Sequence, residues 1–250
     1  MRIQGKKVIG KLIDRPNRFT LKVKINGKIE LAHLRDPGRL GELIKENRMV
    51  LLRKREKIIK TKYEVLAIDY EGFWVFTNSG YHSDIVEEEI INGEIPELRD
   101  CEIKQREVKI GNSRIDFLLD CNGHETFLEV KGCTLVIDKV ALFPDAPTKR
   151  GTKHVRELIG LRKKGYRTIV FFAIMRPDAE IFSPNGHTDP DFTKALKDSV
   201  NHGVEILAYK FSFDGDELRI ISNVPICLDC FKKIDKNKLP TTKTSVKHKV

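Results

Sequence analysis

The sequence predicts a small β-barrel of the OB type over residues 1–80, followed by a mixed-sheet α/β domain over 81–225 and a basic tail over 226–250. Short strand patterns separated by turn signals fill the first part. Helix and strand patterns alternate in the second part, which is typical of a sheet flanked by helices. The chain of 250 residues is 40% hydrophobic, enough for one large core or two smaller ones.

Five short strands and one short helix predict the barrel. Asn26-Gly27 is a strong signal for a tight hairpin turn between the first two strands. Residues 39–44 fit the short helix, and other small barrels remain an alternative to the OB type. The strand patterns cover 18–25, 28–34, 49–53, 61–69 and 73–77.

The second domain begins with a helix for which Ser83 is the expected N-cap. Residues 167–175 contain the apolar run TIVFFAIM, as expected for a strand covered on both faces. The order α-β-β-β-α-β-α-β predicts a mixed sheet. The helices are expected at 83–92, 152–164 and 189–202, and the strands at 106–110, 114–121, 125–132, 167–175 and 204–211.

The charge balance favours a polyanionic partner. Lys and Arg number 46 against 36 Asp and Glu, a net charge of +10, and such a protein attracts nucleic acid or an anionic membrane surface. No apolar run approaches the ~20 residues of a spanning helix, and no strongly amphipathic basic helix is evident. We therefore expect a cytoplasmic protein that binds nucleic acid and no membrane.

Residues 113–132 carry the most specific pattern. Asn122-Gly123 predicts a two-residue turn, which pairs residues whose numbers sum to 245 and sets Asp116 opposite Glu129. Alternation then directs Asp116, Glu129 and Lys131 to one face. Ile115, Phe117, Leu119, Leu128 and Val130 are expected on the other face, in a core.

Two carboxylates that oppose each other across strands repel, so a cation between them explains why both are present. Mg²⁺, or Mn²⁺ in its place, fits hard oxygen ligands from Asp116 and Glu129 together with phosphate and water. Lys131 can steady negative charge that develops on the phosphate. These are parts for metal-assisted phosphodiester hydrolysis. The alternative, a surface hairpin with a merely solvated polar face, stays open at this point.

Six stretches also carry a family likeness: RPNRF (15–19), HLRDPGRL (33–40), SRIDFLL (113–119), LEVKGCTL (128–135), FPDAPTKRGTKHVREL (143–158) and GVEILAYK (203–210). The chain resembles the sugar fermentation stimulation protein A family, and its D…E-V-K pattern resembles the PD-(D/E)xK nuclease superfamily. The second stretch has Arg-Asp-Pro-Gly where many members have Pro-Asn-Thr-Gly. The Cys-x-x-Cys and the lysine tail are outside the usual pattern.

The resemblance implies an OB-like domain followed by a restriction-endonuclease-like domain, DNA binding, and a proposed role in regulating sugar-utilisation genes. In that superfamily an acid on the preceding helix often completes the metal site. The aligned candidate here is Glu88, flanked by Glu87 and Glu89, and the alternative is a solvated helix face. The carbonyl oxygen of Val130 is a further candidate ligand.

Basic residues near both domains are candidates for contacts with nucleic acid. Arg150, Lys153 and His154 lie where the chain passes into the helix that follows the central strand, and there they could contact phosphate. The alternative is that they are ordinary surface charges at the start of a helix. We also hypothesise that Asp145 orders this loop through Arg150. In the barrel a basic groove with stacking aromatics would bind single strands, and a solvated face is equally open. Its candidates are Arg18, Phe19, Arg39, Arg53 and Lys54.

Five cysteines, an odd and sparse number, do not predict a disulfide framework. Cys227-x-x-Cys230 lacks a second pair, so incidental cysteines or one disulfide are favoured over a zinc site. Residues 5–11 spell G-x-x-x-x-G-K, but Leu12 follows in place of Ser or Thr, which argues against a phosphate loop. The lysine-rich residues 231–250 are expected to be disordered.

Three functions compete. The first is a Mg²⁺-dependent nuclease acting on DNA, and the second is a non-cleaving DNA-binding regulator of sugar-metabolism genes. The third is an RNA-processing factor. The intact D…E-x-K pattern favours the first, because a retired site has no physical need for opposed acids. The sequence leaves open whether the chain forms a homodimer.

Overall fold

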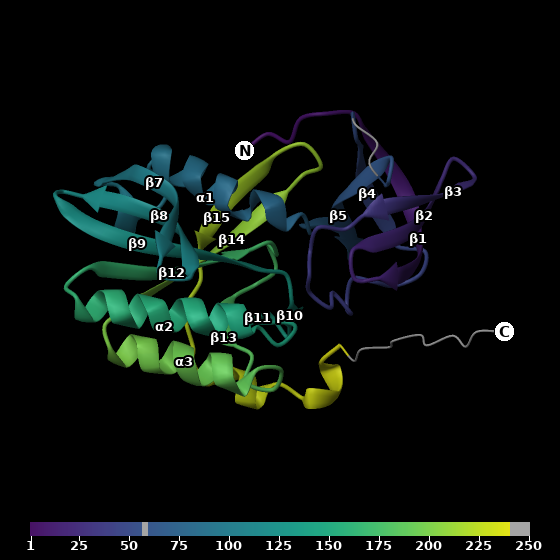
Figure 1. Ribbon diagram of the computed structural model, residues 1–250. Helices are drawn as coiled ribbons and strands as arrows, with labels where there is room; N and C mark the ends of the chain where they lie inside the picture. The colour runs from purple at the N-terminus through teal and green to yellow at the C-terminus, as the bar shows by residue number, and fades with distance from the viewer. Residues whose placement is uncertain (57–59, 241–250) are drawn as a thin grey trace.

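The computed structural model describes residues 1–56 and 60–240, which form a barrel and a larger sheet domain (Figure 1). The barrel, purple and blue in the figure, is on the right, and the sheet domain is on the left. The strands of the first part are β1 (Lys7–Asn17), β2 (Thr20–Ile25), β3 (Lys28–His33), β4 (Met49–Lys54), β5 (Tyr63–Tyr70) and β6 (Phe73–Phe76).

Five strands close the barrel, as the sequence predicted. β1 pairs with β2 and β4, β2 pairs with β3, and β5 joins β3 to β4. The sequence analysis did not predict β1, because the alternation of apolar and polar residues is interrupted there. The G-x-x-x-x-G-K residues lead into this strand. The short helix expected at 39–44 is wrong: Leu40 has a φ of +51° and residues 41–43 form a turn. That left-handed residue is incompatible with a helix.

The second domain is a mixed sheet with a helix on one face and two on the other. Its order continues β6-β14-β12-β9-β8-β7, and β12 runs parallel to β9 and β14. The helices are α1 (His82–Ile91), α2 (Lys149–Lys163) and α3 (Pro190–Asn201), and the strands are β7 (Cys101–Ile110), β8 (Ser113–Cys121), β9 (His124–Cys133), β10 (Val136–Ile137), β11 (Val140–Phe143), β12 (Arg167–Ile174), β13 (Ile181–Pro184), β14 (Glu205–Phe213) and β15 (Leu218–Asn223).

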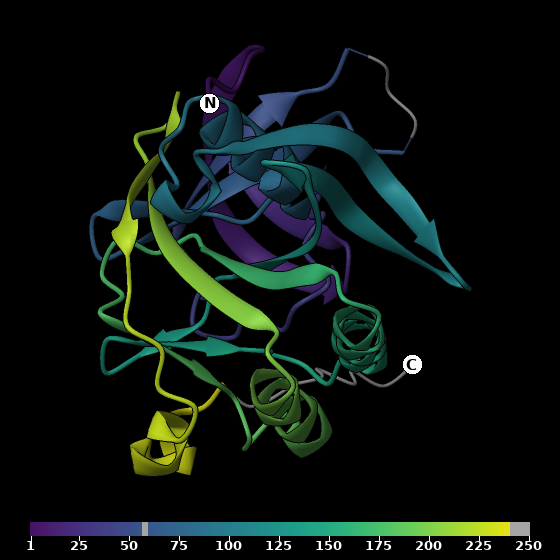
Figure 2. The ribbon, with the colours of Figure 1, turned by 90° about the vertical axis from the view of Figure 1, so that its left-hand side faces the viewer.

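Two cores cover the two faces of this sheet. Ile85 and Val86 of α1 pack with Phe171 in one core, while Leu158 of α2 packs with Phe172 in the other. Figure 2 shows α2 and α3 side by side below the sheet. β12 is buried on both faces, which confirms the prediction from its apolar run.

Several details correct the predictions for the second domain. Helix α1 begins at His82, so Ser83 lies inside its first turn and is not its N-cap. Two disulfides form, Cys101–Cys121 and Cys227–Cys230, and Cys133 is a free, buried thiol. The second agrees with the single disulfide that the sequence allowed, whereas the first was not predicted. The first disulfide links residues paired across β7 and β8, and β7 begins earlier than its charged sequence suggested. The short sheet β10-β11-β13 and strand β15 were also not predicted.

The residues after 230 are ordered as far as the structure describes them, contrary to the prediction of disorder. They form two short 3₁₀ turns, Cys230–Lys233 and Lys236–Lys238. Phe231 packs on Leu135 and Leu142, and this contact anchors the segment. The rest of the predicted tail, 241–250, lies outside the described residues, as does part of the basic run, 57–59.

The sheets of the two domains are continuous, because Trp74 of β6 pairs with Phe213 of β14. The two domains also meet at a set of polar contacts, which we call the joint. Buried Arg176 lies 4.1 Å from the ring centre of Tyr70. Asp145 accepts a hydrogen bond from the backbone N–H of Leu40 at 3.1 Å. Asp145 therefore ties its loop to the barrel and not to Arg150, which corrects that hypothesis. Among the described residues, no helix is long and apolar enough to cross a membrane.

Candidate active site

The hairpin β8–β9 sets the register of the site. Phe117 pairs with Leu128 and Cys121 with His124, which confirms the predicted sum of 245. The expected core positions pack on the α1 side, except that Ile115 joins Val108 in the core of the α2 side. The free end of the β7–β8 hairpin twists away from the sheet (Figure 2), and two-stranded ribbons twist strongly. This twist explains the exception.

Glu129 is buried, with 3% of its surface exposed. Its Oε1 accepts hydrogen bonds from Lys131 Nζ and His154 Nδ1. Its Oε2 is buried and has no hydrogen-bond partner within the described parts of the chain. Burial alone would raise the pKa of Glu129, but Lys131 and His154 outweigh it and bring the pKa below its usual value. Glu129 is therefore an ionised carboxylate with one unused oxygen.

Asp116 reaches the neighbouring strand directly. Its Oδ2 accepts a hydrogen bond from Val130 N at 2.7 Å, and its Oδ1 accepts one from Ser83 Oγ at 3.2 Å. Gly132 of β9 has no side chain, and the ring of His82 occupies the space that a side chain would fill. Helix α1 therefore lies close to β9, which brings Ser83 beside Asp116. Burial and then repulsion from Glu129 raise the pKa of Asp116 to about 6. The site thus concentrates negative charge that a cation would relieve.

Glu88 does not join this pair, which corrects the assignment made by alignment. Its Oε1 lies 3.0 Å from the N-terminal amine of Met1. Asp84 and Glu87 of the same helix pair instead with Arg106 of β7, at 2.6 and 2.5 Å. Helix α1 thus directs its acids towards β7 and the chain start. Within residues 1–56 and 60–240, no three acidic, histidine or cysteine side chains are grouped to hold a metal ion.

The donor set nevertheless fits a hard divalent cation. Asp116 and Glu129 supply carboxylate oxygens, and Glu129 Oε2 is a buried acceptor that the described protein leaves unsatisfied. Mg²⁺ commonly takes one or two carboxylates and completes its shell with water and phosphate. The N–H of Val130 is used by Asp116. The predicted role of the Val130 carbonyl oxygen stays a prediction.

A cavity of about 950 Å³ lies between the free end of the β7–β8 hairpin and the start of α2. Asp116, Glu129 and Lys131 do not line it, and its link to the site is His154, which contacts Glu129. Lys153 Nζ donates to the carbonyl of Asn112 across it, at 3.4 Å. Arg150 and Lys153 were predicted near the site. Lys109, Arg114 and Lys149 were missed, although they flank the turn at 111–112 and open α2. The lining residues are Glu107, Lys109, Asn112, Ser113, Arg114, Lys149, Arg150, Lys153 and His154.

His154 lines this cavity only marginally, because 3% of its surface is exposed and both ring nitrogens have partners. Its Nδ1 contacts Glu129, and its Nε2 faces Arg150 Nε at 3.3 Å. A side chain held in this way cannot contact a phosphate directly. The predicted nucleic-acid contact by His154 is therefore corrected to a contact within the site.

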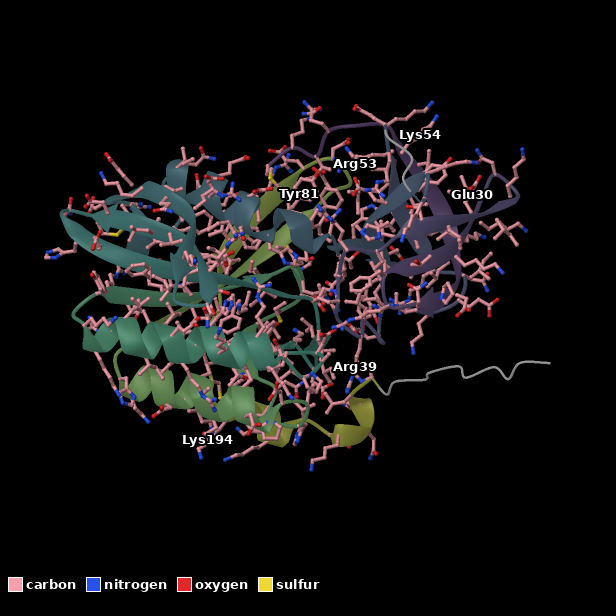
Figure 3. The ribbon with its side chains drawn as sticks, viewed as in Figure 1. Glu30, Arg39, Arg53, Lys54, Tyr81 and Lys194 are labelled. Carbon is pink, nitrogen blue, oxygen red and sulfur yellow. A yellow bond between two sulfur atoms is a disulfide. The ribbon has the colours of Figure 1, made fainter. Side chains whose placement is uncertain are left out.

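The structure does not gather the barrel candidates on one face. Arg53 and Lys54 lie at the top of the barrel in Figure 3, and Arg39 lies at its lower edge. The guanidinium of Arg53 is already engaged in contacts within the protein, because it forms an ion pair with Glu64 and lies over the ring of Tyr81. Arg18 donates to the carbonyl of Pro37 at 2.7 Å. Arg39 lies apart from Arg53 and Lys54, and nucleic-acid binding by the barrel candidates stays a prediction.

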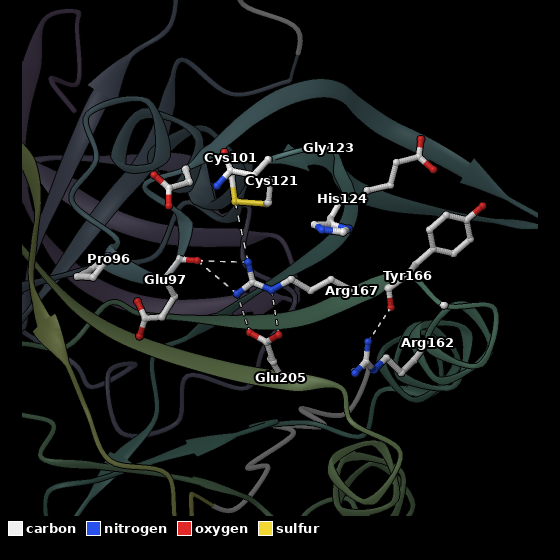
Figure 4. Close-up of a pocket in the computed structure, with 14 residues that line it drawn as sticks. Pro96, Glu97, Cys101, Cys121, Gly123, His124, Arg162, Tyr166, Arg167 and Glu205 are labelled. Atoms are coloured by element: carbon white, nitrogen blue, oxygen red, sulfur yellow. Dashed lines mark hydrogen bonds and ion pairs between the residues drawn. A yellow bond between two sulfur atoms is a disulfide. The ribbon is translucent and has the colours of Figure 1, made fainter.

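A second cavity, of about 830 Å³, lies at the opposite end of β8 and β9, beside the Cys101–Cys121 disulfide (Figure 4). Arg167 crosses it and donates to both carboxylate oxygens of Glu205, at 2.9 and 2.7 Å. This guanidinium is already satisfied by its partners. We assign no chemistry to this cavity.

A closed OB barrel joined to a restriction-endonuclease-like sheet defines the class of this two-domain protein. Residues 13–77 match the family model described as the SfsA N-terminal OB domain, and residues 80–217 match the sugar fermentation stimulation protein RE domain. The chain belongs to the sugar fermentation stimulation protein family, which confirms the resemblance found in its sequence stretches.

Named relatives and a solved structure agree with this membership. A sugar fermentation stimulation protein homolog of Methanosphaera stadtmanae is 49% identical over 210 residues, covering 82% of this chain and 87% of the relative. The homolog of Methanothermobacter thermautotrophicus is 44% identical over 209 residues, covering 83% and 87%. The structure of Pyrococcus furiosus SfsA in complex with Ca²⁺ matches with a TM-score of 0.85 and 29% identity, covering 91% of this chain and 98% of that one.

Proposed function

We propose that the protein binds DNA and hydrolyses phosphodiester bonds at Asp116, Glu129 and Lys131 with a divalent cation, Mg²⁺ or Mn²⁺. One observation carries this proposal: two acids come together from adjacent strands, and one buried oxygen of Glu129 has no partner among the described residues. The other oxygen of Glu129 contacts His154, which lines a cavity rich in Lys and Arg. The relative solved in complex with Ca²⁺ supports a divalent cation, because Ca²⁺ and Mg²⁺ both prefer oxygen ligands.

Each side chain then has a distinct task. Asp116 and Glu129 hold the cation. When bound, Mg²⁺ polarises a phosphoryl oxygen and compensates the charge that develops there. Lys131 is 13% exposed at its side chain and ion-paired to Glu129, so its ammonium group can donate to the same developing charge.

The basic cavity supplies the contacts that position the substrate. Five Lys or Arg side chains and one Glu line it. Lys and Arg side chains bind backbone phosphates without regard to base sequence. The net charge of +10 adds long-range attraction for the same partner.

A second candidate is a DNA-binding regulator that does not cleave. It is favoured by the single observation that Lys131 and His154 both donate to the same oxygen of Glu129, which partly neutralises this ligand. No third acid compensates for that neutralisation among the described residues. Binding would then persist without efficient hydrolysis.

The two candidates are separated by incubating purified protein with labelled duplex DNA, single-stranded DNA and RNA. Each substrate is tested with Mg²⁺, Mn²⁺ or EDTA, and binding is followed in parallel by gel shift. The proposal expects metal-dependent DNA cleavage that EDTA abolishes. DNA binding with no cleavage under any condition supports the regulator, and cleavage of RNA alone supports an RNA-processing factor.

A further inference from the structure

We propose that His154, fixed by Arg150, is a positioning residue that directs Glu129 Oε2 towards the divalent cation. This inference rests on the proposed function and assigns a task within the same site. His154 and Arg150 lie one turn apart on α2, the helix that packs against the sheet on the Glu129 side. Thr148 caps the start of this helix by accepting from Gly151 N at 3.0 Å, which fixes its first turn.

The position of the imidazole proton follows from the two partners of the ring. Arg150 Nε lies 3.3 Å from His154 Nε2, and a guanidinium can donate but not accept. Nε2 must therefore accept, and the single proton of the neutral ring resides on Nδ1. This proton is donated to Glu129 Oε1. Arg150 thus selects the tautomer that binds the carboxylate.

The consequence for Glu129 is an asymmetric carboxylate. Oε1 accepts from both His154 and Lys131, whereas Oε2 has no partner in the described chain. Rotating the carboxylate out of this orientation would break both bonds, so one oxygen is held on Lys131 and His154 while the other faces away from them. An unsatisfied buried acceptor is unfavourable, so a ligand that completes Oε2 explains the arrangement better than packing does.

Partners behind a metal ligand orient it and tune its affinity, and losing one typically weakens metal binding about 10–100-fold. Histidine often serves as the ligand, with a carboxylate behind it. Here the order is reversed: the carboxylate faces the cation and the histidine stands behind it. Asp116 differs, because both of its oxygens already accept bonds from Ser83 and the backbone.

The test is Mn²⁺ affinity by calorimetry, with no nucleic acid present. His154→Gln places its amide near Nε2 and loses the donor to Glu129, so we expect about 10–100-fold weaker binding. His154→Asn keeps a donor at the position of Nδ1 and should stay within about threefold of wild type. Arg156→Gln, an exposed position on the same helix, is the matched control and should not change the affinity.

A second readout is independent of the metal. Nitrogen NMR of the metal-free protein should show His154 protonated at Nδ1, and Arg150→Ala should lose this tautomer preference. Equal Mn²⁺ affinity of His154→Gln and wild type, or protonation at Nε2, would overturn the inference while leaving the proposed function intact. A wild-type protein that binds no Mn²⁺ would remove both.

Discussion

Two places in this protein bring carboxyl groups together in buried surroundings. Asp116 and Glu129 meet in the candidate active site, and Asp36 and Asp145 meet at the joint between the domains, near Glu42. Burial raises the pKa values of both joint aspartates, as it does for Asp116. By burial and charge alone the two places look alike.

Their hydrogen bonds differ. Asp36 accepts from Gly38 N at 2.7 Å, and Asp145 accepts from Leu40 N at 3.1 Å. Arg15 completes the joint by donating to the carbonyl of Gly38 at 2.8 Å. In the active site, Glu129 has an unused oxygen and contacts His154, which lines the basic cavity. A leftover acceptor alone does not separate the two places, because both oxygens of Glu42 at the joint also lack partners among the described residues. The difference is that the pKa of Glu129 lies below its usual value, so that its unused oxygen belongs to an ionised carboxylate, whereas burial raises the pKa of Glu42 to about 7.

The largest expected effect is on catalysis. Glu129→Gln should lower the cleavage rate at least about 10³-fold, because removing a metal ligand removes several kcal/mol of charge stabilisation. DNA binding by gel shift should change little. Glu125→Gln is the matched control, since Glu125 is exposed on the same strand. Full activity in Glu129→Gln would show that the chemistry occurs elsewhere.

The next largest effect is on stability, and it distinguishes the joint from the active site. Asp145→Ala leaves the backbone N–H of Leu40 buried without its acceptor, so chemical denaturation should show a loss of about 2–3 kcal/mol. Asp145→Asn keeps an acceptor oxygen and should lose less than about 1 kcal/mol. Neither variant should alter the affinity for Mn²⁺. A metal-binding defect in both would contradict the structural role of the joint.

Glu42 makes the joint sensitive to pH. Burial raises its pKa to about 7 from 4.5, and neither of its oxygens has a partner among the described residues. The contribution of this group to stability is therefore complete below about pH 4.5 and is lost as the pH rises through about 7.

Glu42→Gln cannot ionise, so it should raise the free energy of unfolding at pH 8 by about 2 kcal/mol and change it little at pH 5. Denaturation curves at the two pH values measure this difference. A variant equally stabilised at both, or stabilised only at pH 5, would be inconsistent with a buried carboxyl group that gives up its proton.

The smallest effect concerns the cavity cations. Lys153→Gln should weaken DNA binding modestly and reduce the slope of log affinity against log salt by about 0.9. Lys194→Gln on α3, at an exposed position that does not line the cavity, should leave the slope unchanged. Equal slopes for both variants would place the DNA on another surface.

The sequence predicted the barrel, the central hairpin and its register because turn residues and alternation are local signals. The Asn122-Gly123 turn alone fixes the position of Asp116 relative to Glu129. The contacts of His154, Glu88 and Arg53 depend on how separate elements pack, and no local pattern encodes that. Arg15, Asp36 and Asp145 come from the stretches that carry the family likeness, yet they build the joint.

The most direct test of this comparison is a crystal soaked in Mn²⁺ and measured for anomalous scattering. We expect one strong peak between Asp116 and Glu129, on the side of Glu129 Oε2, that disappears in Glu129→Gln. A peak among Asp36, Glu42 and Asp145, or none beside Glu129 at saturating Mn²⁺, would contradict the assignment of the metal site.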